Sequence, residues 1–276
     1  MLSGKHDDPD GPNPEAVSAV ARLTQIMVIL RDPEQGCPWD RQQTWRTLVP
    51  HTLEEAYEVG DAAERGDAAG TCDELGDLLF QVVFHARIAE EGGQFGLAEI
   101  ASGVCDKLVR RHPHVFGDGN EASARSQEQS WEAIKATERE ASGSGSALDD
   151  VPPALPALTR ANKLQRRAAR VGFDWQDMAP VLAKVREEIE EVVTALEAGD
   201  QEAARSEVGD VLFAVTNLAR HLDSDPEQRL RDTNVKFERR FRALEAALRA
   251  EGIEPEQADF DALEAAYQRA KASEDG

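Results

Sequence analysis

Two acidic segments decide the fold of this chain: Glu187-Glu188-Ile189-Glu190-Glu191-Val192 and Ser206-Glu207-Val208-Gly209-Asp210-Val211-Leu212-Phe213. Glu188 and Glu191 are three residues apart, as are Glu207 and Asp210, so each pair lies on one face of a helix. Gly199-Asp200 between the segments predicts a tight turn, which makes the two helices antiparallel neighbours. Four carboxylates should then converge between two helices. Because the residues after Asp210 are nearly all apolar, we expect the second helix to be buried on most sides, with its acids emerging at one end of the core.

The same arrangement occurs a second time, 133 residues earlier in the chain. Gly66-Asp67 takes the place of the turn there. An ungapped match of this length indicates an internal repeat, and hence two structurally similar helical halves. The acidic residues of the first copy form a candidate second metal site: Glu54, Glu55, Glu58, Glu74 and Asp77.

Composition and helix-ending residues favour helices throughout the chain. Aromatic residues make up only 5% of it, and no run of alternating polar and apolar residues indicates strands. We predict an all-α protein with two tandem repeats of four to five helices each. The expected domains are 1–146, which ends in a Ser/Gly linker at 141–146, and 147–276. Helices are expected at about 14–31, 51–64, 68–91, 97–111, 126–140, 155–170, 180–198, 201–222, 226–250 and 255–273, with an irregular loop at 32–40.

Charge and cysteine content argue against several classes of protein. The chain has 53 acidic and 31 basic residues and a net charge of −22, so nucleic acids and anionic membranes should be repelled. Three widely spaced cysteines without a Cys-x-x-Cys pair predict neither a disulfide framework nor a zinc site. No signal peptide, membrane-spanning segment, P-loop or dinucleotide-binding glycine motif is recognisable. We therefore expect a cytoplasmic protein.

Converging carboxylates need a compensating charge. Two of them a few ångströms apart repel by about 1–4 kcal/mol at effective dielectric constants of 80 to 20. Protonation or a bound cation relieves this repulsion, and an all-oxygen site suits Mg²⁺ or Mn²⁺. Mg²⁺ often shares its ligand shell with substrate phosphates, which points to a phosphate ester or anhydride as the substrate.

The acidic residues allow two other interpretations. In an acid-rich chain, glutamates at helical spacing usually mark a solvated face, but here they precede an apolar helix and the whole unit occurs twice. A di-iron carboxylate bundle requires Glu-x-x-His, which this chain lacks. The alternative that stays open is a helical interaction or regulatory module with a degenerate nucleotide site.

The motif Glu-Glu-x-x-Glu followed by Glu-x-x-Asp resembles the signature of the all-α nucleoside triphosphate pyrophosphohydrolases, and its tandem arrangement resembles the MazG family. The resemblance covers about residues 17–273. It implies the family's helical fold, hydrolysis of a nucleoside triphosphate to the monophosphate and pyrophosphate with Mg²⁺, and a homodimer. Three flanking strings support it: Arg31-Asp32-Pro33-Glu34-Gln35-Gly36-Cys37-Pro38-Trp39-Asp40, Arg111-His112-Pro113-His114-Val115-Phe116 and Val171-Gly172-Phe173-Asp174-Trp175.

The resemblance also implies roles for individual residues. The metal ligands would be Glu188, Glu191, Glu207 and Asp210, and the phosphate-binding cations would be Lys184, Lys236, Arg239 and Arg240. Tyr267 stands where related chains place a tryptophan against the nucleotide, and it could equally be a packing residue. We expect Glu187 or Glu188 to orient or deprotonate the attacking water, and Lys236 and Arg240 to stabilise the leaving pyrophosphate. The C-terminal half would be the main hydrolase and the N-terminal half auxiliary.

Overall fold

The computed structural model describes residues 11, 13–116 and 145–273, and every regular element in these residues is a helix. The chain divides into two compact units, 1–138 and 139–276. The all-α prediction is therefore confirmed for the described residues. The helix expected at 126–140 lies outside them, as does most of the linker expected at 141–146. None of the described helices combines the length and apolar character needed to cross a bilayer.

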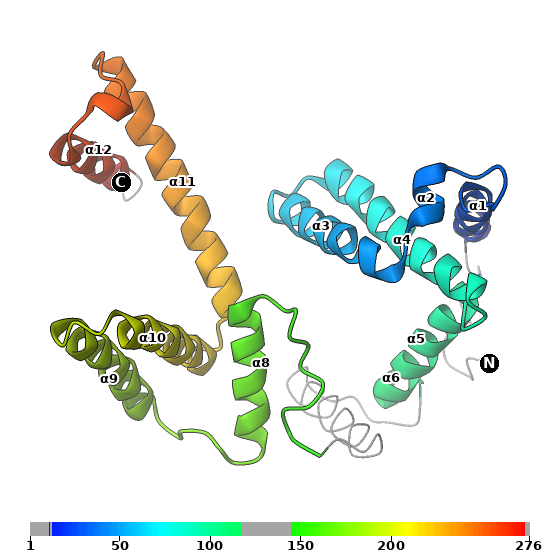
Figure 1. Cartoon of the computed structure of the whole chain (residues 1–276), viewed down its shortest axis with the longest axis horizontal. Helices are drawn as coiled ribbons and strands as arrows, with labels where there is room; N and C mark the ends of the chain where they lie inside the picture. Colours follow the sequence, from blue (N-terminus) through cyan, green and yellow to red (C-terminus); the bar gives the residue numbers. More distant parts are fainter. Residues whose placement is uncertain (1–10, 12, 117–144, 274–276) are drawn as a thin grey trace. The chain divides into compact units, whose positions relative to one another are not determined.

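The first unit is built around an antiparallel helical hairpin, α3 and α4 (Figure 1). Helix α1 packs against α4, and the core of the unit lies among α1, α3 and α4, where Met27, Leu48, Val83 and Phe84 are almost completely buried. Arg31 lies over the ring of Phe84 in this core and forms an ion pair with Glu91 (2.6 Å). The helices are α1 (Pro14–Leu30), α2 (Pro38–Gln42), α3 (Trp45–Glu64), α4 (Ala68–Glu91), α5 (Leu97–Arg111) and α6 (Pro113–Phe116).

The second unit repeats the hairpin as α9 and α10, and α8 packs across α10 (Figure 1). The long helix α11 contacts α8 and α10, and α12 folds back on α11 around Leu244, Leu248 and Ala266. The elements are α8 (Ala157–Arg170), α9 (Met178–Glu197), α10 (Gln201–His221), α11 (Pro226–Ala250), the 3₁₀ helix η1 (Pro255–Gln257) and α12 (Phe260–Ala272).

The turns of the two hairpins are equivalent in conformation as well as in sequence. Gly66 and Gly199 both have positive φ (67° and 73°), a region that glycine enters without steric cost. The next residue, Asp67 or Asp200, caps the following helix by accepting a hydrogen bond from the backbone N–H three residues on (2.9 and 3.0 Å). The predicted turns are thus confirmed.

Three expectations about individual elements are wrong. The loop expected at 32–40 contains the start of α2, because Pro38 is well suited to the first position of a helix. Helix α3 begins at Trp45 rather than near 51, since Thr44 and Thr47 form a reciprocal capping box (3.3 and 2.9 Å) and the helix tolerates Pro50 in its second turn. The helix expected at 255–273 is interrupted, because Asp259 caps a new one, α12.

The expectation that α10 is buried on most sides is also wrong. Leu212 is 52% exposed and Val215 is 44% exposed, although Ala214 and Thr216, the residues on either side of Val215, are buried. Within one chain α10 packs mainly on α9 and α8, and nothing in the described residues covers its remaining face.

Candidate active site

The α9–α10 hairpin brings acidic side chains of the second unit together. Carboxylate oxygens of Glu188 on α9 and of Glu207 and Asp210 on α10 all lie within 4.8 Å of one another. Glu188 is buried, Glu207 half-buried and Asp210 exposed. Glu191 is not part of this group, but loss of hydration and the nearby charge of Glu188 raise the pKa of its carboxyl. We name Glu188, Glu207 and Asp210 the C-terminal acidic group.

Lys184 provides the local positive charge. Its Nζ lies 2.7 Å from Oε1 of Glu187 and 2.7 Å from Oε1 of Glu188, one turn further along α9. Hydrogen bonds to these two carboxylates, Glu187 first, raise the pKa of Lys184. The buried Glu188 is therefore compensated by the ammonium of Lys184.

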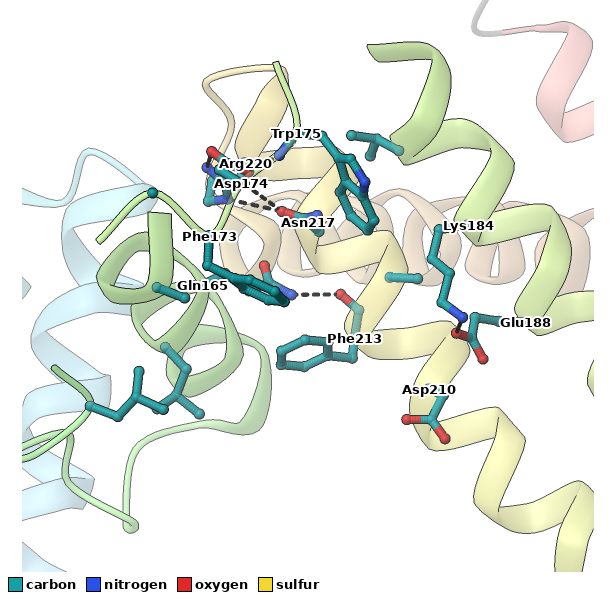
Figure 2. A pocket seen from close by; sticks show the side chains of 16 residues that line it. Gln165, Phe173, Asp174, Trp175, Lys184, Glu188, Asp210, Phe213, Asn217 and Arg220 are labelled. Carbon is teal, nitrogen blue, oxygen red and sulfur yellow. Dashed lines mark hydrogen bonds and ion pairs between the residues drawn. The ribbon is translucent and has the colours of Figure 1, made fainter. Parts of the chain in front are cut away.

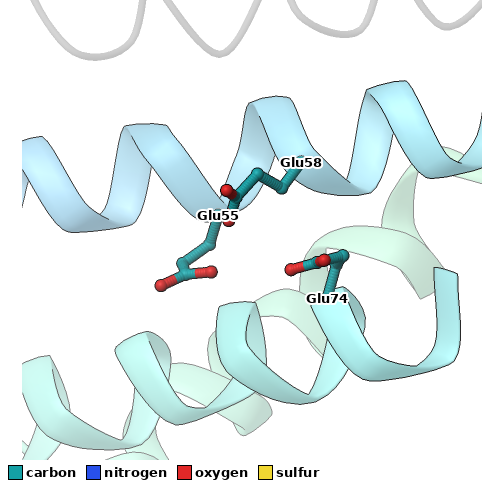
Figure 3. Close-up of side chains that lie close together, drawn as sticks. All are labelled: Glu55, Glu58 and Glu74. Atoms are coloured by element: carbon teal, nitrogen blue, oxygen red, sulfur yellow. The ribbon is translucent and has the colours of Figure 1, made fainter. Parts of the chain in front are cut away.

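The first unit holds a similar group. Oxygens of Glu55, Glu58 and Glu74 lie within 4.8 Å of one another, and Figure 3 shows them between the two helices of the α3–α4 hairpin. Loss of hydration and the charge of Asp77 raise the pKa of Glu55, and loss of hydration and the charge of Glu58 raise the pKa of Glu74. Asp77 is thus a close neighbour rather than a member of the group.

The two units differ in the cation that faces the acids. The repeat places His51 where the second unit has Lys184. His51 Nδ1 lies 3.7 Å from Glu54 Oε2, so Glu54 has a partner outside the acidic group. Imidazole is charged only when protonated, whereas the ammonium of Lys184 is permanently charged near neutral pH. At this position the first group therefore has an imidazole in place of a permanently charged ammonium, although the charge of Arg65 also acts on Glu74.

Comparison with known proteins fits this doubled architecture. The model of the MazG nucleotide pyrophosphohydrolase domain matches residues 43–116 and again residues 176–243, so each match contains one acidic hairpin. The chain belongs to the MazG family. It is 48% identical to a nucleoside triphosphate pyrophosphohydrolase of Escherichia coli K12 over 260 residues, which cover 94% of this chain and 99% of the relative. It is 40% identical to the nucleoside triphosphate pyrophosphohydrolase/pyrophosphatase MazG of Thermotoga maritima, over 95% of this chain and 99% of the relative.

A pocket of about 630 Å³ opens beside the acidic group of this MazG chain (Figure 2). It lies among α8, α9 and α10 and the segment at 172–175, and its walls are mostly apolar. Lys184, Glu188 and Asp210 belong to its lining, so the pocket and the acidic group form one continuous site. Its other polar residues are Gln165, Asp174, Asn217 and Arg220.

The structure does not bring the remaining predicted nucleotide-binding residues to this pocket. Lys236, Arg239 and Arg240 lie on α11, and none of them lines the pocket that the described residues form. Tyr267 lies on α12 against Phe237, with ring centroids 6.0 Å apart, and lines a separate pocket of about 550 Å³. Phosphate binding by α11 therefore stays a prediction.

Sequence reasoning missed the polar residues of the pocket. Gln165 and Asn217 are both buried, but an amide on a helix shows no sign of burial in a sequence. Asp174 binds Arg220 in a two-pronged ion pair and also contacts His221 (3.1 Å), and the network anchors the 172–175 segment to α10. The motif at 171–175 does point to this segment, but in the sequence it is significant only through its resemblance to the MazG family.

Removing the charge of Glu191 should stabilise the metal-free protein. Because its folded pKa is raised, the ionised carboxylate costs stability above that pKa and nothing below the unfolded value. Glu191→Gln should therefore raise the thermal midpoint in EDTA at pH 7 by about 1–3 °C, and the gain should disappear near pH 3. Calorimetry would measure it.

Glu190→Gln is the matched control, since Glu190 is the preceding residue on α9, its side chain is exposed and it does not belong to the acidic group. It should change the midpoint little. A lower midpoint for Glu191→Gln in EDTA at pH 7 would contradict the assigned repulsion between Glu191 and the acidic group.

Proposed function

We propose that this chain hydrolyses nucleoside triphosphates to the monophosphate and pyrophosphate, and that the C-terminal acidic group with Glu191 holds the Mg²⁺ the reaction requires, for which Mn²⁺ could substitute. The observation that carries the proposal is the convergence of Glu188, Glu207 and Asp210 within 4.8 Å in a MazG-family chain. The printed names of the Escherichia coli and Thermotoga maritima relatives support the reaction class.

The residues present fit such an ion. Three carboxylates supply only oxygen ligands, which Mg²⁺ prefers, and Glu191 is one turn from Glu188 and available as a fourth. When bound, the ion would supply charge neutralisation and acidify a bound water. Glu207 and Asp210 would hold it from α10, and Glu188 and Glu191 from α9.

The remaining roles concern water and phosphate. Glu187 and Glu188 both contact Lys184, and either carboxylate can accept a proton from the attacking water. Lys184 also lines the pocket beside the acidic group, where its ammonium can bind a phosphate oxygen. We assign Lys236 and Arg240, which are four residues apart on α11, to the leaving pyrophosphate, with Arg239 beside them.

A homodimer completes the proposal. Exposed apolar residues form a stripe on each helix of the hairpin: Leu182, Ile189, Val193 and Leu196 on α9, and Val208, Leu212 and Val215 on α10. Such a continuous face is better explained by a partner than by solvent. A second copy of this chain is the partner we propose, and sedimentation equilibrium would show a dimer mass or a monomer.

The first unit takes an auxiliary role in this proposal. Its group of Glu55, Glu58 and Glu74 is complete enough to hold a second ion, but His51 there replaces Lys184. We also place the protein in the cytoplasm, because all three cysteines are free and Cys72 and Cys105 are exposed, as in reducing compartments.

Product analysis tests the reaction. The protein is incubated with each common nucleoside triphosphate in Mg²⁺ or in EDTA, and anion exchange separates the products. Monophosphate and pyrophosphate that form only with Mg²⁺ are the expected result. Diphosphate and orthophosphate would place the cut at another bond and overturn the proposal, and no hydrolysis of any nucleotide would favour a helical interaction module.

A further inference from the structure

We propose that Lys184 is a displaceable counter-ion: in the metal-free protein its ammonium holds the carboxylate of Glu188, and it must leave that carboxylate when a divalent ion binds. This inference rests on the proposed function, because it takes the C-terminal acidic group to be the ion site. It adds a regulation of that site, in which the ion and the ammonium exclude each other at one carboxylate.

The ammonium of Lys184 and a divalent ion compete for the same carboxylate. Nζ of Lys184 lies 2.7 Å from Oε1 of Glu188, and Figure 2 shows it directed at that carboxylate. An oxygen of the same carboxylate lies within 4.8 Å of oxygens of Glu207 and Asp210. Mg²⁺ lies about 2.0–2.1 Å from its ligand oxygens, so an ion held by these three residues would repel an ammonium that stayed on Glu188.

Glu188 needs a positive charge when no ion is bound. Only 7% of its side chain is exposed, and a carboxylate removed from water is unstable unless it has a partner. Among the ion pairs of the described residues, the pair that reaches the C-terminal acidic group comes from Lys184. Arg205 of α10 pairs with Glu202 instead (2.9 Å). Lys184 therefore stabilises the metal-free hairpin by doing what an ion would otherwise do.

Lys184 is also built to leave. Its side chain is 36% exposed, and it ends in a flexible four-carbon stem that can carry the ammonium to a new partner. Glu187, which is 57% exposed, already lies 2.7 Å from Nζ and keeps a partner available after Glu188 is released. A divalent ion carries twice the charge of an ammonium and approaches an oxygen more closely, so it wins the competition for the buried carboxylate.

The first unit lacks this device. The repeat places His51 where the second unit has Lys184, and Glu55 where it has Glu188. His51 Nδ1 lies 3.7 Å from Glu54, the equivalent of Glu187, and no ion pair within the described residues joins Glu55 to a lysine or an arginine. An ion that binds the first group therefore displaces no ammonium. The counter-ion belongs to the unit to which we assign the hydrolysis.

This exchange makes the binding of an ion and of a phosphate interdependent. An ion alone must break the pair between Lys184 and Glu188, which lowers its affinity. A phosphate that draws the ammonium away frees the carboxylate, and an ion that frees the ammonium makes it available to a phosphate. By linkage, each ligand strengthens the binding of the other by the same factor.

Mn²⁺ binding to the nucleotide-free chain tests the competition. Electron paramagnetic resonance measures the free Mn²⁺, and Glu188→Gln identifies which bound ion belongs to the C-terminal group. Lys184→Met keeps an unbranched side chain of similar length but removes the ammonium. It should tighten Mn²⁺ binding at this group about tenfold, because the carboxylate is then always available.

Lys163→Met is the matched control. Lys163 lies on α8 of the same unit, its side chain is exposed and it does not line the pocket beside the acidic group. The variant changes the net charge by the same amount, so it reports any general effect of charge on cation binding. It should alter the Mn²⁺ affinity less than about twofold.

Thermal unfolding separates a counter-ion from a lysine that is only structural. In EDTA, Lys184→Met should lower the midpoint by about 3–6 °C, because Glu188 loses its partner. In saturating Mg²⁺ the midpoint should come within about 1 °C of the parent protein in the same buffer, since the ion takes the place of the ammonium. An equal loss in both buffers, or an unchanged or weaker Mn²⁺ affinity in Lys184→Met, overturns the inference.

The same measurements distinguish this inference from the proposed function. Mn²⁺ binding that Glu188→Gln leaves unchanged would overturn the ion site, and the counter-ion with it. An ion site that Glu188→Gln removes but Lys184→Met does not tighten would overturn the counter-ion alone. Missing pyrophosphate release, with the expected Mn²⁺ affinities and midpoints intact, would overturn the proposed reaction and leave the counter-ion supported.

Discussion

Glu188→Gln should reduce Mg²⁺-dependent pyrophosphate release by at least about a thousandfold. Glu188 is the buried member of the C-terminal acidic group. It forms an ion pair with Lys184 and lines the pocket. Glutamine keeps the size of the side chain but removes the charge that pairs with Lys184 and that would bind the proposed metal ion. Initial rates at saturating Mg²⁺ and nucleotide would measure the loss in kcat.

Glu55→Gln is the matched control, because the repeat places Glu55 where the second unit has Glu188. It should leave more than half of the activity if the C-terminal unit is the main hydrolase. The fold should survive both changes, since Lys184 keeps its 2.7 Å ion pair with Glu187 when Glu188 is neutral. Loss of activity in Glu55→Gln together with an active Glu188→Gln would reverse the assignment of the two units.

Asp174→Asn should destabilise the second unit by about 2–4 kcal/mol. Both carboxylate oxygens of Asp174 accept hydrogen bonds from Arg220, and one of them also contacts His221. The side chains of Asp174 and Arg220 are only 21% and 12% exposed, so removing the carboxylate charge leaves a poorly hydrated guanidinium without its counter-ion. Urea denaturation at pH 7, followed by circular dichroism, would measure the difference.

The effect should depend on pH in a defined direction. Hydrogen bonds from Arg220 hold the pKa of Asp174 below its ordinary value. A lowered folded pKa gives stability that is fully present above the unfolded value of about 3.9 and is lost as the pH falls through the folded pKa. The gap between the parent protein and Asp174→Asn should therefore shrink below about pH 4.

Asp232→Asn provides the control for an exposed pair. Asp232 lies 3.1 Å from Arg229, but both side chains are about half exposed or more. Surface pairs of this kind contribute about 0–1 kcal/mol, so the change in unfolding free energy should be small. An equally small effect for Asp174→Asn would show that the 172–175 segment does not depend on its ion pair.

Local sequence signals were sufficient for most of the helices. Capping aspartates and glycines with positive φ can be recognised from neighbouring residues alone, which is why α4 and α11 begin and end where expected. The start of α3 was missed because a capping box upstream outweighed the helix-breaking tendency of Pro50. In each case the outcome depended on interactions within one or two turns.

In the candidate site, too, the features that depend on nearby residues could be predicted, and those that depend on distant residues could not. The acidic groups could be predicted because their members are spaced three residues apart on helices joined by a short turn. The pocket could not, because it depends on Gln165 of α8 meeting the backbone of Phe213 of α10, residues that are distant in sequence. The exposed fraction of α10 also depends on its packing against other helices, which cannot be inferred from the spacing of apolar residues within α10.

The glycine turns of the two hairpins also bear on the order of folding. Because Gly199 closes α9 onto α10 directly, the contacts of this hairpin join residues that are near in sequence, and such contacts form fastest in a folding chain. All members of the C-terminal acidic group lie on these two helices, whereas α8 and α11 must dock over longer chain separations. We expect the acidic group to assemble early in folding, before the pocket beside it is complete, so that divalent ions should accelerate refolding of the second unit.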